Sequence, residues 1–272
     1  MDYSAPPYFN FYSQIIDTLL RRKAVTTSMS VLAVCAGETD KRIFQSHGFE
    51  DVTISNLDSR IAGDEFKPYK WSYQDAEGLT FPDNSFELVV ACAGLHHCRS
   101  PHRGLLEMYR VARRCAVVLE ARDGFLSRIA VRLGVADEYE VTAVAGNNFA
   151  YGGVANTAVP NYIYRWTERE VEKAIASFAP HVRPKLIFLY KFAPPLANLR
   201  TRKTLRGLLV MCLAWAPLWV ITKLFPRQGN LIGFAIVKPE LPGDLFPWVM
   251  LEAGQPTINR EWVGQHYKEP LR

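Results

Sequence analysis

The stretch Asp75-Ala76-Glu77-Gly78-Leu79-Thr80-Phe81-Pro82-Asp83-Asn84-Ser85-Phe86-Glu87-Leu88-Val89-Val90 decides the fold of this chain. Its end opens an apolar run, 86–93, that is typical of a strand buried on both faces of a sheet. Its start directly follows residues 70–74, which predict another strand. The acidic residues at its start therefore stand just after a strand, where a parallel sheet binds its ligands.

Outward from this stretch, short apolar runs alternate with amphipathic segments. The alternation is typical of a parallel α/β sheet with crossover helices. Further strands are predicted at 31–36, 52–57, 115–120, 186–192 and 232–237, and helices at 8–22, 39–47, 101–113, 125–133 and 167–179.

The composition fits an ordinary globular protein. The chain has 272 residues, of which 49% are hydrophobic and 22% charged, so the chain is too apolar for a disordered protein. We expect a helix in 1–30, a main domain in 31–240 and a C-terminal tail, 241–272, that packs on the domain. Five cysteines without C-x-x-C spacing and no recognisable signal peptide favour the cytoplasm.

The residues that follow the predicted strands form a nucleoside-binding pattern. Asp58 follows the second strand, where a carboxylate can hold the two hydroxyls of a ribose. Asp75 follows the third, where a carboxylate can accept a hydrogen bond from an adenine amine. The strands on either side end at Gly37 and at the pair His96-His97.

The opening stretch resembles the run D-A-E-x-L-P-F-P-D-x-S-F-D-x-V of the class I S-adenosylmethionine-dependent methyltransferases. Leu95-His96-His97 and Glu107-x-x-Arg110-Val111 follow at distances typical of that superfamily. The match covers residues 31–120, and its parts are specific in combination. The resemblance implies a Rossmann-like α/β fold with a mostly parallel seven-stranded sheet, flanking helices and an elaborated C-terminal half. It also implies S-adenosylmethionine as cofactor.

The resemblance assigns cofactor contacts to the strand ends. It implies that Gly37 passes the methionine part of the cofactor, that Asp58 binds the ribose, and that Asp75 with Ala76 frames the adenine. The full predicted cofactor set is Cys35, Ala36, Gly37, Asp58, Ser59, Asp75, Ala76 and Ala93. We expect the N-terminal helix in 1–30 to cover this cofactor site.

The chain departs from the family pattern in the first strand, where Ala33 replaces the usual acid, and in two turns. Its glycine-rich first loop is reduced to Gly37, and Arg113-Arg114 replaces the usual Pro-Gly-Gly turn. A cofactor-binding but non-catalytic regulatory or assembly protein at the membrane is therefore the alternative to an enzyme. A dinucleotide dehydrogenase would need G-x-G-x-x-G, which residues 36–40 do not supply.

His96 and His97 are the predicted catalytic residues. A neutral imidazole is a suitable base near pH 7 for a hydroxyl nucleophile, so we expect O-methylation with at least one of the two as base, the other packing in the core. We expect no metal at His96, His97 and Cys98, because adjacent side chains point apart and no further ligand cluster is evident.

Residues 140–165 predict an acceptor-binding loop. The stretch is rich in Gly, Asn and Tyr, and amides and phenols suit a small-molecule, glycan or lipid-linked acceptor; a merely solvated loop is the alternative. The predicted substrate residues are Asn147, Asn148, Tyr151, Tyr162, Tyr164 and Arg165.

The positive charge of the chain is concentrated in one segment, 196–230. This segment carries six basic residues and no acid, whereas the whole chain has a net charge of +5, so the remainder sums to −1. Nucleic acid is therefore not an expected partner. Its centre, 208–221, has no charge and reaches ~21 Å as a helix, short of a ~30 Å bilayer core. Two interpretations of residues 199–225 stay open: a core or dimer-interface helix, and a peripheral contact with the inner membrane face.

Overall fold

The computed structural model describes residues 6–193 and 205–267, which form an α/β domain around a seven-stranded sheet. The strand order is β3-β2-β1-β4-β5-β7-β6. Within this sheet β7 runs in the opposite direction to the other six strands. This order confirms the predicted Rossmann-like fold. The strands are β1 (Val31–Val34), β2 (Val52–Asn56), β3 (Lys70–Tyr73), β4 (Phe86–Cys92), β5 (Ala112–Ala121), β6 (Lys185–Lys191) and β7 (Leu231–Val237).

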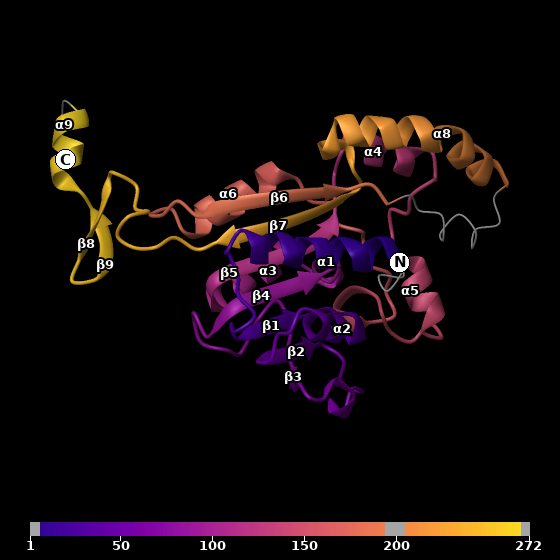
Figure 1. Ribbon diagram of the computed structural model, residues 1–272, viewed down its shortest axis with the longest axis horizontal. Coiled ribbons are helices and arrows are strands. Elements are labelled where there is room, and N and C mark those ends of the chain that lie inside the picture. The colour runs from indigo at the N-terminus through magenta and orange to yellow at the C-terminus, as the bar shows by residue number, and fades with distance from the viewer. Residues whose placement is uncertain (1–5, 194–204, 268–272) are drawn as a thin grey trace.

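Helices cover both faces of this sheet (Figure 1). In chain order the principal helices are α1 (Pro6–Arg21), α2 (Glu38–Ser46), α3 (Pro101–Val111), α4 (Phe125–Arg132), α5 (Val141–Gly146), α6 (Glu168–Phe178), α8 (Leu205–Leu224) and α9 (Arg260–His266). Successive residues of a strand point to opposite faces. Val31 and Ala33 of β1 accordingly pack in the core with α1 and α2, whereas Leu32 and Val34 pack in the core with α3 and α6.

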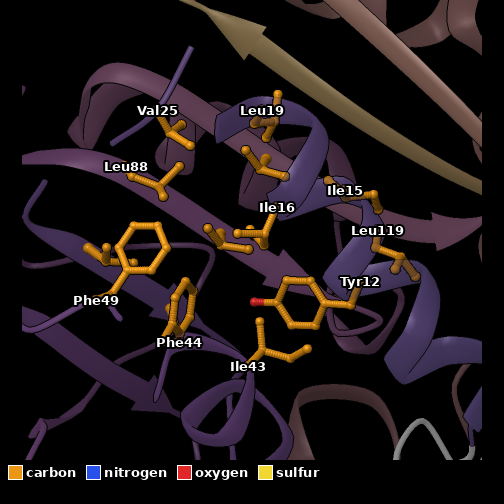
Figure 2. Close-up of a cluster of buried hydrophobic side chains, with 14 of the residues drawn as sticks. Tyr12, Ile15, Ile16, Leu19, Val25, Ile43, Phe44, Phe49, Leu88 and Leu119 are labelled. Atoms are coloured by element: carbon orange, nitrogen blue, oxygen red, sulfur yellow. The ribbon is translucent and has the colours of Figure 1, made fainter. Parts of the chain in front are cut away.

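The first helix belongs to the core. Phe11, Ile15, Ile16 and Leu19 are fully buried against the sheet and α2, as Figure 2 shows for three of them. No described residue of α1 lines the cofactor cavity described below. The described residues of α1 thus pack in the core, and the cover of the cofactor site by residues 1–30 stays a prediction.

The helix α8 is an insertion between two strands that pair directly. β6 and β7 form an antiparallel ladder from Lys185–Val237 to Lys191–Leu231, so their connection is a hairpin and needs no crossover helix. Leu231 begins β7 at the edge where the parallel strands end. α8 is thus held at the carboxyl edge of the sheet and is not packed across a sheet face (Figure 1).

The C-terminal tail touches the domain only at its start. Leu245 pairs with Val182, and the Arg183 guanidinium lies over the Phe246 ring. Beyond this contact, the hairpin of β8 (Val249–Glu252) and β9 (Gln255–Ile258) and the helix α9 project away from the sheet (Figure 1). The described contacts of the tail with the domain thus lie at the start of the tail, and its packing on the domain stays a prediction. Among the described residues, no helix has the length and apolarity needed to cross a membrane.

Candidate active site

A cavity of about 280 Å³ opens at the carboxyl ends of β1, β2 and β4. β1 leads into α2 on one face of the sheet and β4 leads toward α3 on the other, so this is the point where the chain changes sides. Ligands of open α/β sheets bind at that point. Of the predicted residues, the cavity is lined by Cys35, Asp58, Asp75, Ala76, Ala93, His97, Asn147 and Tyr151.

Two residues in the wall of this cavity have left-handed backbone conformations. Cys35 at the end of β1 has φ +53°, and Ala93 at the end of β4 has φ +51°. A Cβ atom on Gly94 would lie 2.3 Å from the Cβ of Cys35, so the two strand ends approach each other as closely as glycine allows. Non-glycine residues rarely adopt this conformation, and such strain gathers at ligand sites.

Asp58 stands on the cavity wall and is held by Arg60. The guanidinium of Arg60 binds both carboxylate oxygens of Asp58 and stacks on the ring of Tyr151. These hydrogen bonds keep the pKa of Asp58 below its usual range, so this carboxyl is ionised at neutral pH. Asp58, Arg60 and Tyr151 together connect the end of β2 to the 140–165 loop.

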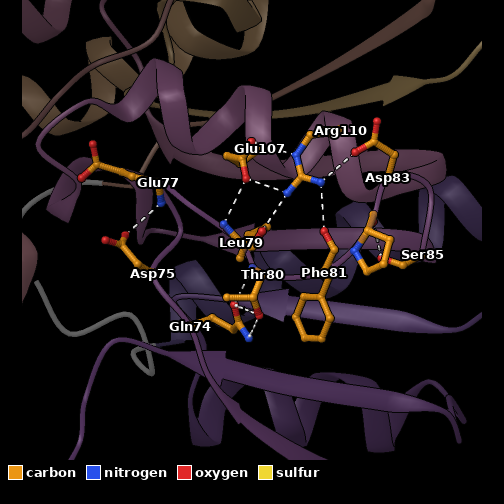
Figure 3. A network of polar contacts seen from close by, with 11 residues as sticks. Gln74, Asp75, Glu77, Leu79, Thr80, Phe81, Asp83, Ser85, Glu107 and Arg110 are labelled. Atoms are coloured by element: carbon orange, nitrogen blue, oxygen red, sulfur yellow. Dashed lines mark hydrogen bonds and ion pairs between the residues drawn. The ribbon is translucent and has the colours of Figure 1, made fainter.

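Asp75 and Ala76 are positioned by a polar network built on Arg110. The Arg110 guanidinium donates to the carbonyls of Leu79 and Phe81 and forms ion pairs with Asp83 and Glu107 (Figure 3). Glu107 in turn accepts from the Leu79 amide. The Glu107-x-x-Arg110 pair thus fixes the loop that follows Asp75.

The first loop is fixed by Asp40, a residue that the sequence did not single out. The backbone amide of Gly37 donates to Asp40 Oδ2 over 2.9 Å, and Tyr12 donates to Asp40 Oδ1 over 3.0 Å. A Cβ added at Gly37 would have nothing within 4 Å, and its backbone is extended. Gly37 itself is therefore unstrained, whereas Cys35 at the start of this loop has φ +53°.

His96 and His97 lie in a buried cluster with two glutamates. His96 Nδ1 is 2.7 Å from Glu120 Oε2, and His96 Nε2 is 3.1 Å from Glu140 Oε2. His97 Nε2 is 3.4 Å from the same Glu140 oxygen. Only His97 of the two lines the cavity, because His96 is 2% exposed and lies behind it.

The charges of the two histidines differ at neutral pH. Burial disfavours the charged form of His96, but Glu120 and Glu140 outweigh it and raise the pKa of His96 to about 10. Burial, and then the charge on His96, lower the pKa of His97 to about 4. His96 is therefore a cation between two carboxylates, and His97 is a neutral imidazole on the cavity wall.

The two imidazoles do not point apart, contrary to the prediction. Their ring centroids are 4.5 Å apart, and both reach Glu140. Among the described residues, His96, His97 and Glu140 are close enough to hold a metal ion, and Cys98 does not belong to this group. Both histidines already share the Glu140 carboxylate through short polar contacts.

The acceptor loop is divided between two cavities. Asn147 and Tyr151 line the cofactor cavity together with Ala155 and Asn156, and Asn156 is tied to the Leu57 carbonyl over 3.0 Å. Tyr162, Tyr164 and Arg165 instead line a second cavity of about 580 Å³, between α4 and α6. The predicted substrate-binding residues of the 140–165 loop therefore do not form a single site.

Several predicted residues do not line the cofactor cavity, namely Ala36, Gly37, Ser59 and Asn148. Conversely, the prediction missed Glu120 and Glu140. Both are in contact with His96 although they are 24 and 44 positions away in the chain. A single acid at the end of a strand and another in a loop carry no spacing signal that a sequence pattern would reveal.

The comparison with known families agrees with this geometry. Residues 42–119 match the family described as "Methyltransferase domain". The chain therefore contains a methyltransferase domain over at least these residues. A domain of this family transfers a methyl group to an acceptor molecule, and the cofactor expected from the sequence is S-adenosylmethionine. No curated protein sequence matches the chain.

The chain is also similar to solved structures. A proposed methyltransferase from Bacillus halodurans C-125 is 15% identical, with a TM-score of 0.50, and the match covers 83% of this chain and 99% of the other. Magnesium protoporphyrin IX methyltransferase from Synechocystis, with bound SAH, is 10% identical with a TM-score of 0.48, covering 86% and 84%. An S-adenosylmethionine-dependent methyltransferase from Mesorhizobium loti is 11% identical with a TM-score of 0.48, covering 81% and 96%.

The residues of the cavity fit the cofactor of this methyltransferase. Asp58 offers an ionised carboxylate to a pair of hydroxyls. Asp75 accepts the Glu77 amide at Oδ1, and among the described residues its Oδ2 has no partner, so it can accept from an exocyclic amine. The chemistry of the donors and acceptors therefore matches a nucleoside.

Proposed function

We propose that this methyltransferase methylates an oxygen atom of a small-molecule, glycan or lipid-linked acceptor. The observation that carries the proposal is the neutral imidazole of His97 on the cavity wall, with the Glu140 carboxylate 3.4 Å behind it. A hydroxyl nucleophile needs a group that takes its proton, and a neutral imidazole does so. Amine acceptors lose a proton more easily and depend less on such a base.

The cofactor supplies an activated methyl group on a sulfonium sulfur. Asp58 holds the ribose, and Asp75 with Ala76 frames the adenine. The acceptor oxygen forms the new bond to the methyl carbon while the carbon–sulfur bond breaks and its electron pair stays on sulfur. The acceptor proton passes to the imidazole of His97. Its Nε2 lies 3.4 Å from the Glu140 carboxylate and its Nδ1 lies 3.5 Å from the Gly153 carbonyl, so both nitrogens of the resulting imidazolium have an acceptor.

His96 acts through its neighbours as a positioning residue. Glu120 accepts from both His96 and the Leu95 amide, which fixes the turn that carries the pair. Glu140, held by His96, stands ready to stabilise the imidazolium that forms on His97. Orientation of nucleophile and methyl in a site shielded from water supplies the rest of the acceleration.

The test is transfer of labelled methyl from S-adenosylmethionine into fractions of small molecules and lipids, followed by mass spectrometry and NMR of the product. A methyl ether or ester is the expected product. An N- or C-methylated product would refute O-methylation. Tight binding of the cofactor without transfer to any fraction would support the non-catalytic alternative instead.

A further inference from the structure

The helix α8 is apolar in sequence, and yet most of its side chains that the structure describes are exposed. Of its side chains that the structure describes, Thr222 alone is buried, while Leu213, Trp219, Val220 and Leu224 are exposed. A helix that is hydrophobic all round must be covered by protein or by lipid. Among the described residues, no other element supplies that cover.

A second apolar face lies beside α8. Phe125, Ile129 and Leu133 recur at every fourth position of α4 and its end, so they share one face, and Phe125 and Leu133 are 65% and 67% exposed. α4 contacts the turn Pro226–Gln228 that ends α8, where the Arg227 carbonyl approaches Gly124 (Figure 1). The exposed residues Phe125, Ile129, Leu133, Trp219, Val220 and Leu224 are named the α4/α8 surface here.

The charges around the α4/α8 surface are mainly positive. Arg128, Arg132, Lys223 and Arg227 are exposed on its two helices and the following turn. Arg128 and Arg227 have acidic neighbours, Asp123 at 3.4 Å and Glu168 at 3.8 Å, which lie further in. Segment 196–230 contains six basic residues and no acid. Lys223 Nζ lies 5.7 Å over the ring of Trp219, an arrangement typical of an interfacial helix.

The α4/α8 surface and the cofactor cavity share one edge of the sheet. α4 follows the end of β5, and α8 lies between the end of β6 and the start of β7. All of these points lie at the edge where β1, β2 and β4 end and the cavity opens (Figure 1). A molecule bound at the α4/α8 surface is therefore on the same side as the methyl group.

We propose that the α4/α8 surface docks on an anionic membrane surface, and that the acceptor is a lipid-borne molecule taken from that membrane. The second part rests on the proposed function. Apolar side chains flanked by basic residues match the acyl–headgroup boundary of an anionic leaflet. A protein partner would have to supply an apolar groove with an acidic rim. A second copy of this chain would place its basic residues against the same basic residues of the first, and these charges repel each other.

The test is flotation of the full chain with vesicles of phosphatidylcholine and phosphatidylglycerol in equal parts, at low and high salt. We expect co-flotation at low salt and weaker co-flotation at high salt or with phosphatidylcholine alone. The double variant Phe125→Glu, Leu224→Glu should lose at least tenfold of the bound fraction, and Lys223→Gln about fivefold. Ile258→Glu, at an exposed apolar position in the β8–β9 hairpin, should bind like the wild type.

Calorimetry with S-adenosylmethionine on each variant shows that the domain is still folded. Wild-type vesicle binding by the double variant, or no binding by the folded wild-type chain, would overturn the docking surface. A dimer in light scattering that the double variant abolishes, without vesicle binding, would overturn it in favour of a second copy. Vesicle binding without methyl transfer into any lipid fraction would refute the lipid-borne acceptor and leave the docking surface standing.

Discussion

The ribose-binding role of Asp58 gives the sharpest prediction, because its carboxylate would accept hydrogen bonds from both Arg60 and the ribose. We consider Asp58→Asn, which keeps the size of the side chain and one acceptor oxygen but removes the charge and the second acceptor. With the cofactor bound, the carboxylate would accept from the ribose hydroxyls while Arg60 continues to bind it. A carboxylate has about four lone-pair sites, so both partners can be accommodated.

The magnitude follows from the bonds that the substitution removes. A hydrogen bond to a charged group contributes about 1.5–3 kcal/mol, and the Asp58 side chain is only 18% exposed, so water replaces little of it. Loss of one such bond and of the charge on the other gives about 2–3 kcal/mol. That corresponds to a rise of about 30- to 150-fold in the Kd of S-adenosylmethionine.

The assay is titration calorimetry with S-adenosylmethionine and with its demethylated product, and Arg60→Ala is the matched control. This control removes the ion pair and the stacking on Tyr151 but leaves the carboxylate in place. At neutral pH Asp58 stays ionised in the control, so its Kd should change less than fivefold. Wild-type affinity in Asp58→Asn, or a larger loss in Arg60→Ala, would mean that Asp58 serves the ion pair and not the ribose.

Three further perturbations test other parts of the site. His97→Ala should lower kcat by about 10²- to 10⁴-fold with the Kd of the cofactor nearly unchanged, and an unchanged kcat in single-turnover assays would remove His97 as the base. Arg110→Ala should lower the free energy of unfolding by about 2–4 kcal/mol in urea denaturation, because five contacts to the 79–83 loop and Glu107 are lost together. A loss below about 0.5 kcal/mol would show that the network does not hold the loop. Burial raises the pKa of Asp40 from 3.8 to about 6, so its contribution to stability is present below pH 3.8 and is lost as the pH rises to about 6. The difference between these two pKa values corresponds to about 3 kcal/mol of stability. In Asp40→Asn the melting temperature should therefore change less with pH between pH 4 and 7 than in the wild type. The same pH dependence in the variant and the wild type would contradict the assignment.

The sheet could be predicted from the sequence because its signals are local. The predicted strand 86–93 is observed as Phe86–Cys92 and the predicted strand 232–237 as Leu231–Val237. Apolar runs of this length are buried on both faces, and the helices between them alternate regularly. The ends of these strands then located Cys35, Asp58, Asp75 and Ala93 at one cavity.

The 140–165 loop could not be predicted in the same way. Its course depends on left-handed residues that are not glycine, such as Phe149 and Ala155, whose side chains disfavour this backbone conformation. These turns send Tyr151 over the cofactor cavity and Tyr162 into the second one. The partners of His96 were likewise set by tertiary contact, since Glu120 and Glu140 reach it from separate elements.

The insertion that carries α8 explains how a methyltransferase domain can gain a docking surface without losing its core. Lys191 and Leu231 are partners in the β6–β7 ladder, so the insertion leaves and returns at neighbouring points. Asn230 closes its base, accepting from the Ala193 amide and donating to the Ala193 carbonyl, both over 2.8 Å. Lengthening a loop whose ends are already held together costs little entropy. Because this hairpin ends at the edge where the cavity opens, a segment added there contacts its surroundings beside the active site.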